Sequence, residues 1–352
     1  MKQYFACDAH KRYSLFGGAT ETGKSGEYVR VEHRRSSMRN YLGKIPPGSP
    51  IAIETVGNWY WIVDEMEKAG HKPLLVNAGK AKLMMGQINK TDKIDVDGMT
   101  LLMRNGTLPT VWIPPAEIRD QRELPRMRMA LVDVRTKLKN RIHATLAKYA
   151  IGIEEVSDIF GKRGRELMKQ QLDELPPQTC SCVKAQLTLL DQVAEQINQC
   201  EERIDQVIDK TPMMQLLMTI PGIGPILTTV IALEVGDINR FPNAEHLASY
   251  AGTVPRIHAS GGRSFHGRTR PDVNHYLKWA FVEAANVIAL NQERMVHHHA
   301  GQLYLRIKAR KGHAKAIVAV ARHLAEATYW VIKKNEPYRE PKMNKAVSSI
   351  QK

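Results

Sequence analysis

The chain has 352 residues, enough for two or three modules. It carries 51 Lys and Arg against 36 Asp and Glu, and this formal net charge of +15 predicts a polyanionic partner, most commonly nucleic acid. With 43% hydrophobic and 25% charged residues, the composition is that of a globular protein and excludes wholesale disorder.

The N-terminal residues, the apolar segment and the cysteines indicate the cellular location. The first residues, MKQYFACDAHK, hold no apolar signal-peptide core, so we expect no secretion. Residues 211–233 are uncharged and long enough to span a bilayer, but prolines and glycines at their centre break a spanning helix, so we predict no membrane segment. A reduced cytoplasm is expected because the four cysteines form no CxxC pair: Cys7, Cys180, Cys182 and Cys200.

Residues 1–115 predict an α/β domain. Three short apolar runs come first, with a turn signal at 21–26, and two further runs flank a helical pattern at 58–69 that Gly70 ends. Three consecutive strands followed by alternating helices and strands favour a mixed sheet. The predicted strands are 4–8, 12–19, 26–33, 50–55 and 72–78.

Residues 116–210 predict a helical connector with two apolar stripes at helical spacing. Such a pair of long amphipathic helices suggests a coiled coil, serving either as a spacer arm or as a contact between subunits. The stripes are Met127, Leu131, Val134, Leu138, Ile142 and Leu146, and then Val183, Leu187, Leu190, Ala194, Ile197, Ile204 and Ile208.

The first connector helix is also strongly basic. Arg135, Lys139 and Arg141 belong to a run of cations with few acids to offset them. Such a run is either a solvated helix face or a surface that contacts nucleic-acid phosphates.

Residues 211–340 predict a mostly helical C-terminal domain, followed by a loose tail at 341–352. Gly222 and Gly224 bracket Ile223 in a turn between two apolar helices, which is similar to a helix-hairpin-helix. Backbone amides at the start of the second helix can bind a DNA phosphate without reading sequence. The alternative is a purely structural turn.

Four acids in the first domain predict a metal site. Asp8 and Glu54 each end an apolar strand, and Asp92 and Asp95 lie three residues apart on one helix face. Carboxylates that converge in this way suit Mg²⁺ or Mn²⁺, which can promote phosphodiester cleavage. Taken alone, Asp92 and Asp95 could simply cap a helix. We interpret His10 as a surface group or phosphate contact rather than as a catalyst.

A glycine- and arginine-rich loop near residue 260 is the second candidate site. Ser260 precedes Gly261 and Gly262, which permit close backbone approach to a ligand. A serine hydroxyl among arginines could attack phosphorus, but from composition alone a plain phosphate-binding loop is the safer interpretation, and Ser264 is then as good a candidate as Ser260. The surrounding arginines are Arg256, Arg263, Arg268 and Arg270.

With these residues, the chain resembles the DEDD-type transposases of bacterial insertion sequences over nearly its whole length. The resemblance implies a RuvC-like, RNase H-type N-terminal domain, a coiled-coil connector, and a C-terminal transposase domain with a catalytic serine. By position it assigns the four acids to Asp8, Glu54, Asp92 and Asp95, and the nucleophile to Ser260. The motifs that carry it include CDAHK, IAIETVG, NKTDKIDVDGM, IPGIGPILTTVIALEVGDINRF and YAGTVPRIHASGGRSFHGR.

The resemblance also implies how the protein acts. Family members are RNA-guided recombinases in which a non-coding guide RNA pairs with donor and target DNA. Their subunits form a homo-oligomer, dimer or tetramer, and a composite site joins the carboxylates of one subunit to the serine of another. Pro125 departs from the family pattern, and we expect the basic helix to begin after it.

Two alternatives stay open from the sequence. The first is a RuvC-like, metal-dependent junction nuclease that forms no covalent intermediate. The second is a non-catalytic DNA-binding scaffold.

Overall fold

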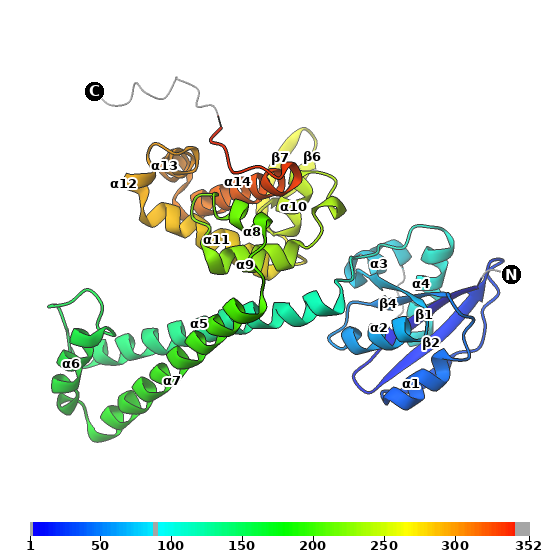
Figure 1. The fold of residues 1–352 in the computed structure, drawn as a ribbon, viewed down its shortest axis with the longest axis horizontal. Coiled ribbons are helices and arrows are strands. Elements are labelled where there is room, and N and C mark those ends of the chain that lie inside the picture. The colour runs from blue at the N-terminus through cyan, green and yellow to red at the C-terminus, as the bar shows by residue number, and fades with distance from the viewer. Residues whose placement is uncertain (1–2, 87–90, 342–352) are drawn as a thin grey trace. The chain divides into compact units, whose positions relative to one another are not determined.

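The computed structural model describes residues 3–86 and 91–341 (Figure 1). The chain divides into two compact units, Met1–Ala116 and Glu117–Lys352, which we describe separately.

The N-terminal unit contains a five-stranded mixed sheet in the order β3-β2-β1-β4-β5. The first three strands are antiparallel, and β4 and β5 run parallel to β1. The predicted mixed sheet is therefore confirmed. Its strands are β1 Gln3–Ala9, β2 Tyr13–Thr20, β3 Val29–Glu32, β4 Pro50–Glu54 and β5 Lys72–Val76.

Helices cover both faces of this sheet. Successive strand residues point to opposite sides, and apolar residues on each side need to be buried. Cys7 and Ile53 face a core that includes residues of α1 and α2. Ala6 and Ala52 face a second core with residues of α3 and α4. The helices are α1 Arg35–Leu42, α2 Trp59–Lys68, α3 Ala78–Met85 and α4 Asp92–Arg104.

Helix α4 lies close on β2 because residue 17 is glycine. A Cβ atom at Gly17 would lie 2.7 Å from Val96 Cγ1 and 3.0 Å from Tyr28 Cδ1. Tyr28 also donates a hydrogen bond of 2.6 Å to Asp97 on α4. This close packing sets the position of the N-terminus of α4 and of the acids that it carries.

The second unit opens with two long antiparallel helices, as Figure 1 shows. Ile142 and Leu146 of the first pack in one core with Val183 and Leu190 of the second. The elements are α5 Ala116–Lys148, α6 Lys162–Gln171, the 3-10 helix η1 Leu172–Glu174 and α7 Pro177–Val207.

The expectation that the basic helix begins after Pro125 is wrong, because α5 runs through this proline from Ala116. Proline keeps a helical φ and removes one intrahelical hydrogen bond. Pro125 is buried, and Arg122 and Arg126 on either side are both held by Glu234, so tertiary contacts maintain the helix here.

The remaining elements surround a core centred on α11 and α14, in which Phe281 and Leu324 are fully buried. This region is mainly helical, as predicted, but the glycine- and arginine-rich segment expected as a loop is a two-stranded hairpin. The elements are α8 Pro212–Leu217, α9 Pro225–Val235, η2 Ile238–Arg240, α10 Ala244–Tyr250, β6 Pro255–Ser260, β7 Arg263–Thr269, α11 His275–Leu290, α12 Gln292–Met295, α13 His299–Lys311 and α14 His313–Lys334.

Two further observations concern the expected environment. Within the described ranges, none of the helices has the length and apolar character needed to cross a bilayer. All four cysteines are free thiols, and Cys182 is exposed whereas Cys7, Cys180 and Cys200 are buried.

Candidate active site and nucleic-acid interface

Asp8 and Glu54 lie at the same edge of the N-terminal sheet. In the parallel pairing of β1 with β4, Cys7 is opposite Ile53, and the next residue on each strand is Asp8 or Glu54. Asp8 is 7% exposed and Glu54 is half-buried. The carboxyl ends of parallel strands meet at one edge of a sheet, and this places the two acids side by side, as their positions at strand ends predict.

Helix α4 brings Asp92 to this edge. Thr91 caps the helix and accepts a hydrogen bond from the amide of Ile94, which leaves Asp92 and Asp95 in the first turn. Negative charge is favoured there by the helix dipole. Tyr13 at the start of β2 donates a hydrogen bond of 3.1 Å to Asp92 Oδ2 and fixes the carboxylate.

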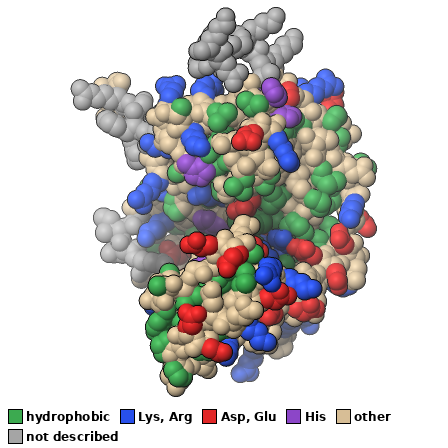
Figure 2. Space-filling model, turned by 90° about the vertical axis from the view of Figure 1, so that its left-hand side faces the viewer, with side chains coloured by type: hydrophobic (Ala, Val, Ile, Leu, Met, Phe, Trp, Pro, Cys, Tyr) green, Lys and Arg blue, Asp and Glu red, His purple; other side chains and the backbone are tan. Residues whose placement is uncertain are grey.

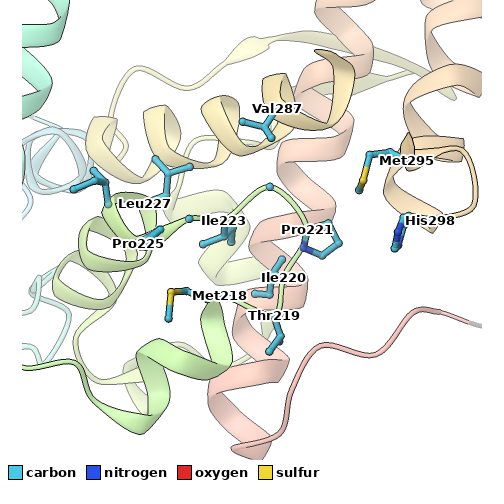
Figure 3. Close-up of a pocket in the computed structure, with 13 residues that line it drawn as sticks. Met218, Thr219, Ile220, Pro221, Ile223, Pro225, Leu227, Val287, Met295 and His298 are labelled. Atoms are coloured by element: carbon cyan, nitrogen blue, oxygen red, sulfur yellow. The ribbon is translucent and has the colours of Figure 1, made fainter. Parts of the chain in front are cut away.

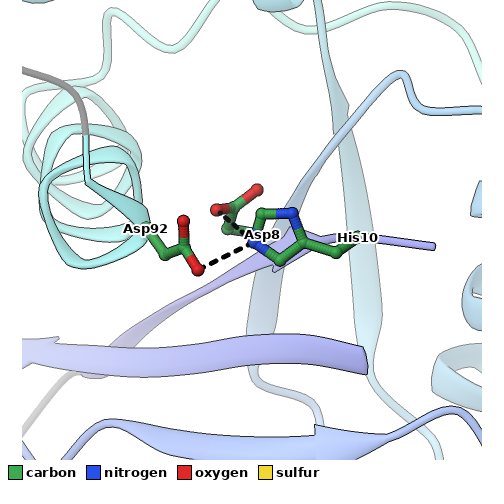
Figure 4. A group of neighbouring side chains, drawn as sticks. All are labelled: Asp8, His10 and Asp92. Atoms are coloured by element: carbon green, nitrogen blue, oxygen red, sulfur yellow. Dashed lines mark ion pairs between the residues drawn. The ribbon is translucent and has the colours of Figure 1, made fainter. Parts of the chain in front are cut away.

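Asp8, His10 and Asp92 form the centre of the site (Figure 4). His10 Nε2 lies 3.2 Å from Asp8 Oδ2 and 2.9 Å from Asp92 Oδ2. One ligand atom from each residue lies within 4.8 Å of the others. Three electron-pair donors from β1, the β1–β2 turn and α4 therefore converge on a small volume.

This group differs from the predicted set of four acids. Within the described part of the chain, Glu54 and Asp95 are not members of such a ligand group. Glu54 lies beside Asp8 on the neighbouring strand, and Asp95 lies one helical turn beyond Asp92. His10 is the residue that sequence reasoning set aside. Its spacing held a signal, because residues two apart in extended backbone point to the same face, and His10 follows Asp8 by two residues, just past the end of β1.

The geometry of His10 fits a bound cation. Its Nε2 atom is shielded from solvent and makes no hydrogen bond with any described residue, although two carboxylate oxygens lie close to it. A nitrogen lone pair that faces two carboxylates is unfavourable unless a positive charge lies between them. Two carboxylates with an imidazole are a suitable donor set for a divalent metal ion.

Polar contacts hold the turn that carries His10. Asn58 Nδ2 donates a hydrogen bond of 2.7 Å to the His10 carbonyl, and the His10 amide donates to the Tyr13 carbonyl at 2.9 Å. Beneath the turn, His33 Nε2 lies 2.8 Å from the hydroxyl of the buried Ser14. Burial raises the pKa of the neighbouring Cys7 thiol to about 12, so this cysteine is an inert core residue.

Ser260 lies at the tip of the β6–β7 hairpin. It pairs with Arg263 across a two-residue turn in which Gly261 and Gly262 have φ of +55° and +76°. This conformation favours glycine and is typical of tight hairpin turns. Ser260, Arg256 and Arg268 are exposed, whereas the side chains of Arg263 and Ser264 lie outside the described residues. The hairpin presents Ser260 to solvent beside a tight turn.

The predicted phosphate-binding turn joins α8 to α9. Gly222 has a φ of +80°, and a Cβ atom there would lie 2.4 Å from the Ala284 carbonyl oxygen, so this glycine permits close packing on α11. Gly224 precedes α9 and provides no side-chain cap, which leaves the first-turn amides after Pro225 for other acceptors. The adjacent pocket of about 690 Å³ is mainly apolar, as Figure 3 shows for Ile223 and Val287.

The basic residues of the connector lie along α5. Arg141 is exposed, Arg135 is half-buried, and the Lys139 ammonium lies 4.7 Å from the centre of the Phe160 ring. Figure 2 shows cationic and acidic side chains interspersed over the face it presents.

Two family models match the chain. The model of DEDD transposases of the IS110 type matches residues 6–151, and the model described as the transposase IS116/IS110/IS902 family matches residues 214–300. The first match contains Asp8, His10 and Asp92, and the second contains the α8–α9 turn and the Ser260 hairpin.

Curated relatives agree with these matches. A probable family 20 transposase of Pseudomonas aeruginosa is 23% identical over 270 residues, 74% of this chain and 76% of that protein. The transposase for insertion sequence element IS1328 of Yersinia enterocolitica is 25% identical over 67% of this chain and 69% of its own length. A pilin gene-inverting protein of Moraxella bovis is 33% identical over 41% of this chain and 46% of its own. The chain is therefore a member of the IS110 family of insertion-sequence transposases.

Proposed function

We propose that this transposase is a metal-dependent, RNA-guided recombinase that cuts and exchanges DNA strands with Ser260 as its nucleophile. The observation that carries the metal-dependent part is the convergence of Asp8, His10 and Asp92 at one edge of the N-terminal sheet. Ser260 and the RNA guide are carried by the family resemblance, with the exposed serine of the β6–β7 hairpin in support.

In this proposal the carboxylates hold and orient a divalent cation, Mg²⁺ or Mn²⁺. Asp8 and Asp92 are its ligands, and Glu54 and Asp95 complete the acidic edge. The bound cation supplies Lewis-acid stabilisation of charge on the scissile phosphate. Tyr13 and the cap of α4 keep Asp92 in place before substrate binds.

Ser260 is proposed to attack phosphorus. An Oγ–P bond forms as the bond from phosphorus to a deoxyribose oxygen breaks; the serine proton passes to water and the leaving oxygen takes a proton from water, so the strand is cut and held covalently. Attack by the hydroxyl of a partner strand would reverse these bond changes and give recombined DNA. Arg256, Arg263 and Arg268 are suited to stabilise the charge on the phosphate.

Nucleic acid is proposed to bind at two further places. The amides at the start of α9, next to Gly222 and Gly224, contact the DNA backbone. Arg135, Lys139 and Arg141 contact the non-coding guide RNA, which pairs with donor and target DNA. The protein acts as a homo-oligomer, dimer or tetramer, in which carboxylates and serine form a composite site. Sequencing of the RNA that copurifies with the protein tests whether it binds a guide RNA.

The serine assignment is tested with end-labelled DNA on a denaturing gel that scores protein-linked label. Ser260→Ala should bind DNA normally but yield no covalent adduct and no recombinant. The matched control is Ser264→Ala, four positions further along the same hairpin, which should retain most of the adduct. Asp8→Asn should lose cleavage together with the adduct.

Other outcomes would favour the alternatives. An undiminished adduct from Ser260→Ala, or a loss confined to Ser264→Ala, would place the nucleophile elsewhere. Metal-dependent cleavage without any adduct would favour a junction nuclease that uses water. DNA binding without cleavage under any metal condition would leave a scaffold.

A further inference from the structure

The imidazole of His10 gives the acidic site a nitrogen donor. Its Nε2 atom faces Asp8 Oδ2 and Asp92 Oδ2 at 3.2 and 2.9 Å, and it is buried without a hydrogen-bond partner in the described chain (Figure 4). These contacts are ion pairs when the ring is protonated, whereas a neutral ring with its Nε2 lone pair free presents a metal-binding atom beside both carboxylates. Here it points at the two carboxylates.

The turn holds this imidazole in place. Asn58 fixes the His10 carbonyl, and the ring of Tyr13 lies 4.6 Å from the imidazole while its hydroxyl binds Asp92. The Arg30 guanidinium packs over the Tyr13 ring, 3.8 Å from its centroid. These contacts order Nε2 before a metal arrives, which lowers the entropic cost of using it as a ligand.

A nitrogen ligand changes which cation the site prefers. Mg²⁺ takes oxygen ligands in a strict octahedron and keeps several waters, so an imidazole contributes little to its binding. First-row transition metals bind imidazole well, and Mn²⁺ also accepts carboxylates and water. A set of two carboxylates and one imidazole therefore discriminates between ions that an all-carboxylate set would bind alike.

We propose that His10 is a metal ligand and that it makes this site select Mn²⁺ over Mg²⁺. This inference rests on the proposed function, because it assumes that Asp8 and Asp92 hold a divalent cation. The inference adds two points to the proposed function: His10 is a ligand besides the acids, and the preferred ion is Mn²⁺.

The test uses the full-length protein and Mn²⁺ alone. Titration followed by electron paramagnetic resonance gives the affinity, and a pulsed measurement detects ¹⁴N coupled to the bound ion. Wild type should show a coupled nitrogen and require a large excess of Mg²⁺ to displace Mn²⁺. His10→Ala should lose the nitrogen signal and bind Mn²⁺ about tenfold more weakly or worse, since even the loss of an indirect support costs that much.

Two further variants separate this inference from the proposed function. His10→Asp makes the ligand set all-oxygen, and it should restore metal binding while shifting the preference toward Mg²⁺. Asp8→Asn should abolish binding of both ions. Circular dichroism checks that each variant is folded, which is expected for the two His10 variants because the His10 side chain is about one-third exposed (35%).

The outcomes are distinguishable. If wild type binds neither ion, the proposed metal site fails and the inference fails with it. If wild type binds Mn²⁺ without a coupled nitrogen and with the same affinity as Mg²⁺, the metal site stands and the role of His10 is overturned. A nitrogen signal that survives in His10→Ala would assign the ion to other histidines and would also overturn it.

Discussion

Glu65 joins two helices of the N-terminal unit through a buried carboxylate. Its side chain is fully buried, and it accepts hydrogen bonds from Arg35 at 2.6 Å and Arg39 at 2.5 Å. The hydrogen bond from Arg39, supported by Arg35, lowers the pKa of Glu65 to about 2 against the opposing effect of burial. The contact holds α1 against α2.

This pairing makes stability depend on pH in a defined window. Because the pKa of Glu65 is lower in the folded protein, the ionised carboxylate stabilises the fold fully above about pH 4.5, and this contribution is lost as the pH falls toward 2. Glu65→Gln should lower the free energy of unfolding by about 1.5–3 kcal/mol at pH 7, the range for hydrogen bonds to charged groups. Urea unfolding at several pH values measures the difference, which should shrink below pH 4.5. A difference that stays constant to pH 2 would contradict this account.

Some residues of the candidate site can be predicted from the sequence, and others cannot. Asp8 and Glu54 were identifiable because a charge at the end of an apolar strand is unusual, and strand ends meet at one edge. His10 was missed because its contact with Asp92 spans more than 80 residues and depends on how closely α4 lies on β2. Gly17 sets the separation between α4 and β2, because it leaves room for Val96 of α4, and the sequence alone does not reveal this contact.

At the scale of elements, Glu234 fixes the connector to the C-terminal helices. It is 2% exposed and lies at the end of α9, where it binds Arg126 of α5 at 2.7 Å and Asn274, the cap of α11, at 2.9 Å. Arg122 donates to the carbonyls of Leu233 and Glu234 and so caps α9 from α5. Three helices meet at this one carboxylate.

Removing this charge should be costly because Glu234 is the buried counter-charge of the guanidinium groups of Arg122 and Arg126. Glu234→Gln should reduce the free energy of unfolding by about 3–5 kcal/mol, the usual result of breaking a buried ion pair from one side. The matched control is Glu123→Gln, since the mostly exposed Glu123 also contacts Arg126, at 3.5 Å, and its loss should cost within about 0.5 kcal/mol. Denaturant unfolding measures both. Equal effects from the two substitutions would refute the idea that Glu234 joins the helices.

The elements were predictable to different degrees. The five strands and α2 follow apolar patterns bounded by turn signals, and these features are local. Helices α1 and α3 were missed because they are short, eight residues each, and carry few buried side chains. At β6–β7 the sequence predicts a loop, because glycine and arginine lack strand propensity, whereas the chain forms a hairpin around a turn in which Gly261 and Gly262 adopt positive φ.

At the scale of the whole molecule, the chain consists of two compact units with separate cores. We therefore expect two unfolding transitions in calorimetry rather than one. Glu65→Gln should lower only the transition of the first unit, and Glu234→Gln only that of the second. A single transition that both substitutions shift equally would show that the units unfold together.

The distribution of thiols has a practical consequence for studying assembly. Cys182 is exposed near the start of α7, whereas the other three cysteines are buried, and burial raises the pKa of Cys7 and Cys200 and so disfavours their reactive thiolates. A maleimide dye should therefore label the native protein at Cys182 alone, without mutagenesis. Mixing donor- and acceptor-labelled chains would then make energy transfer a direct measure of how many copies gather on DNA, and of when they do so.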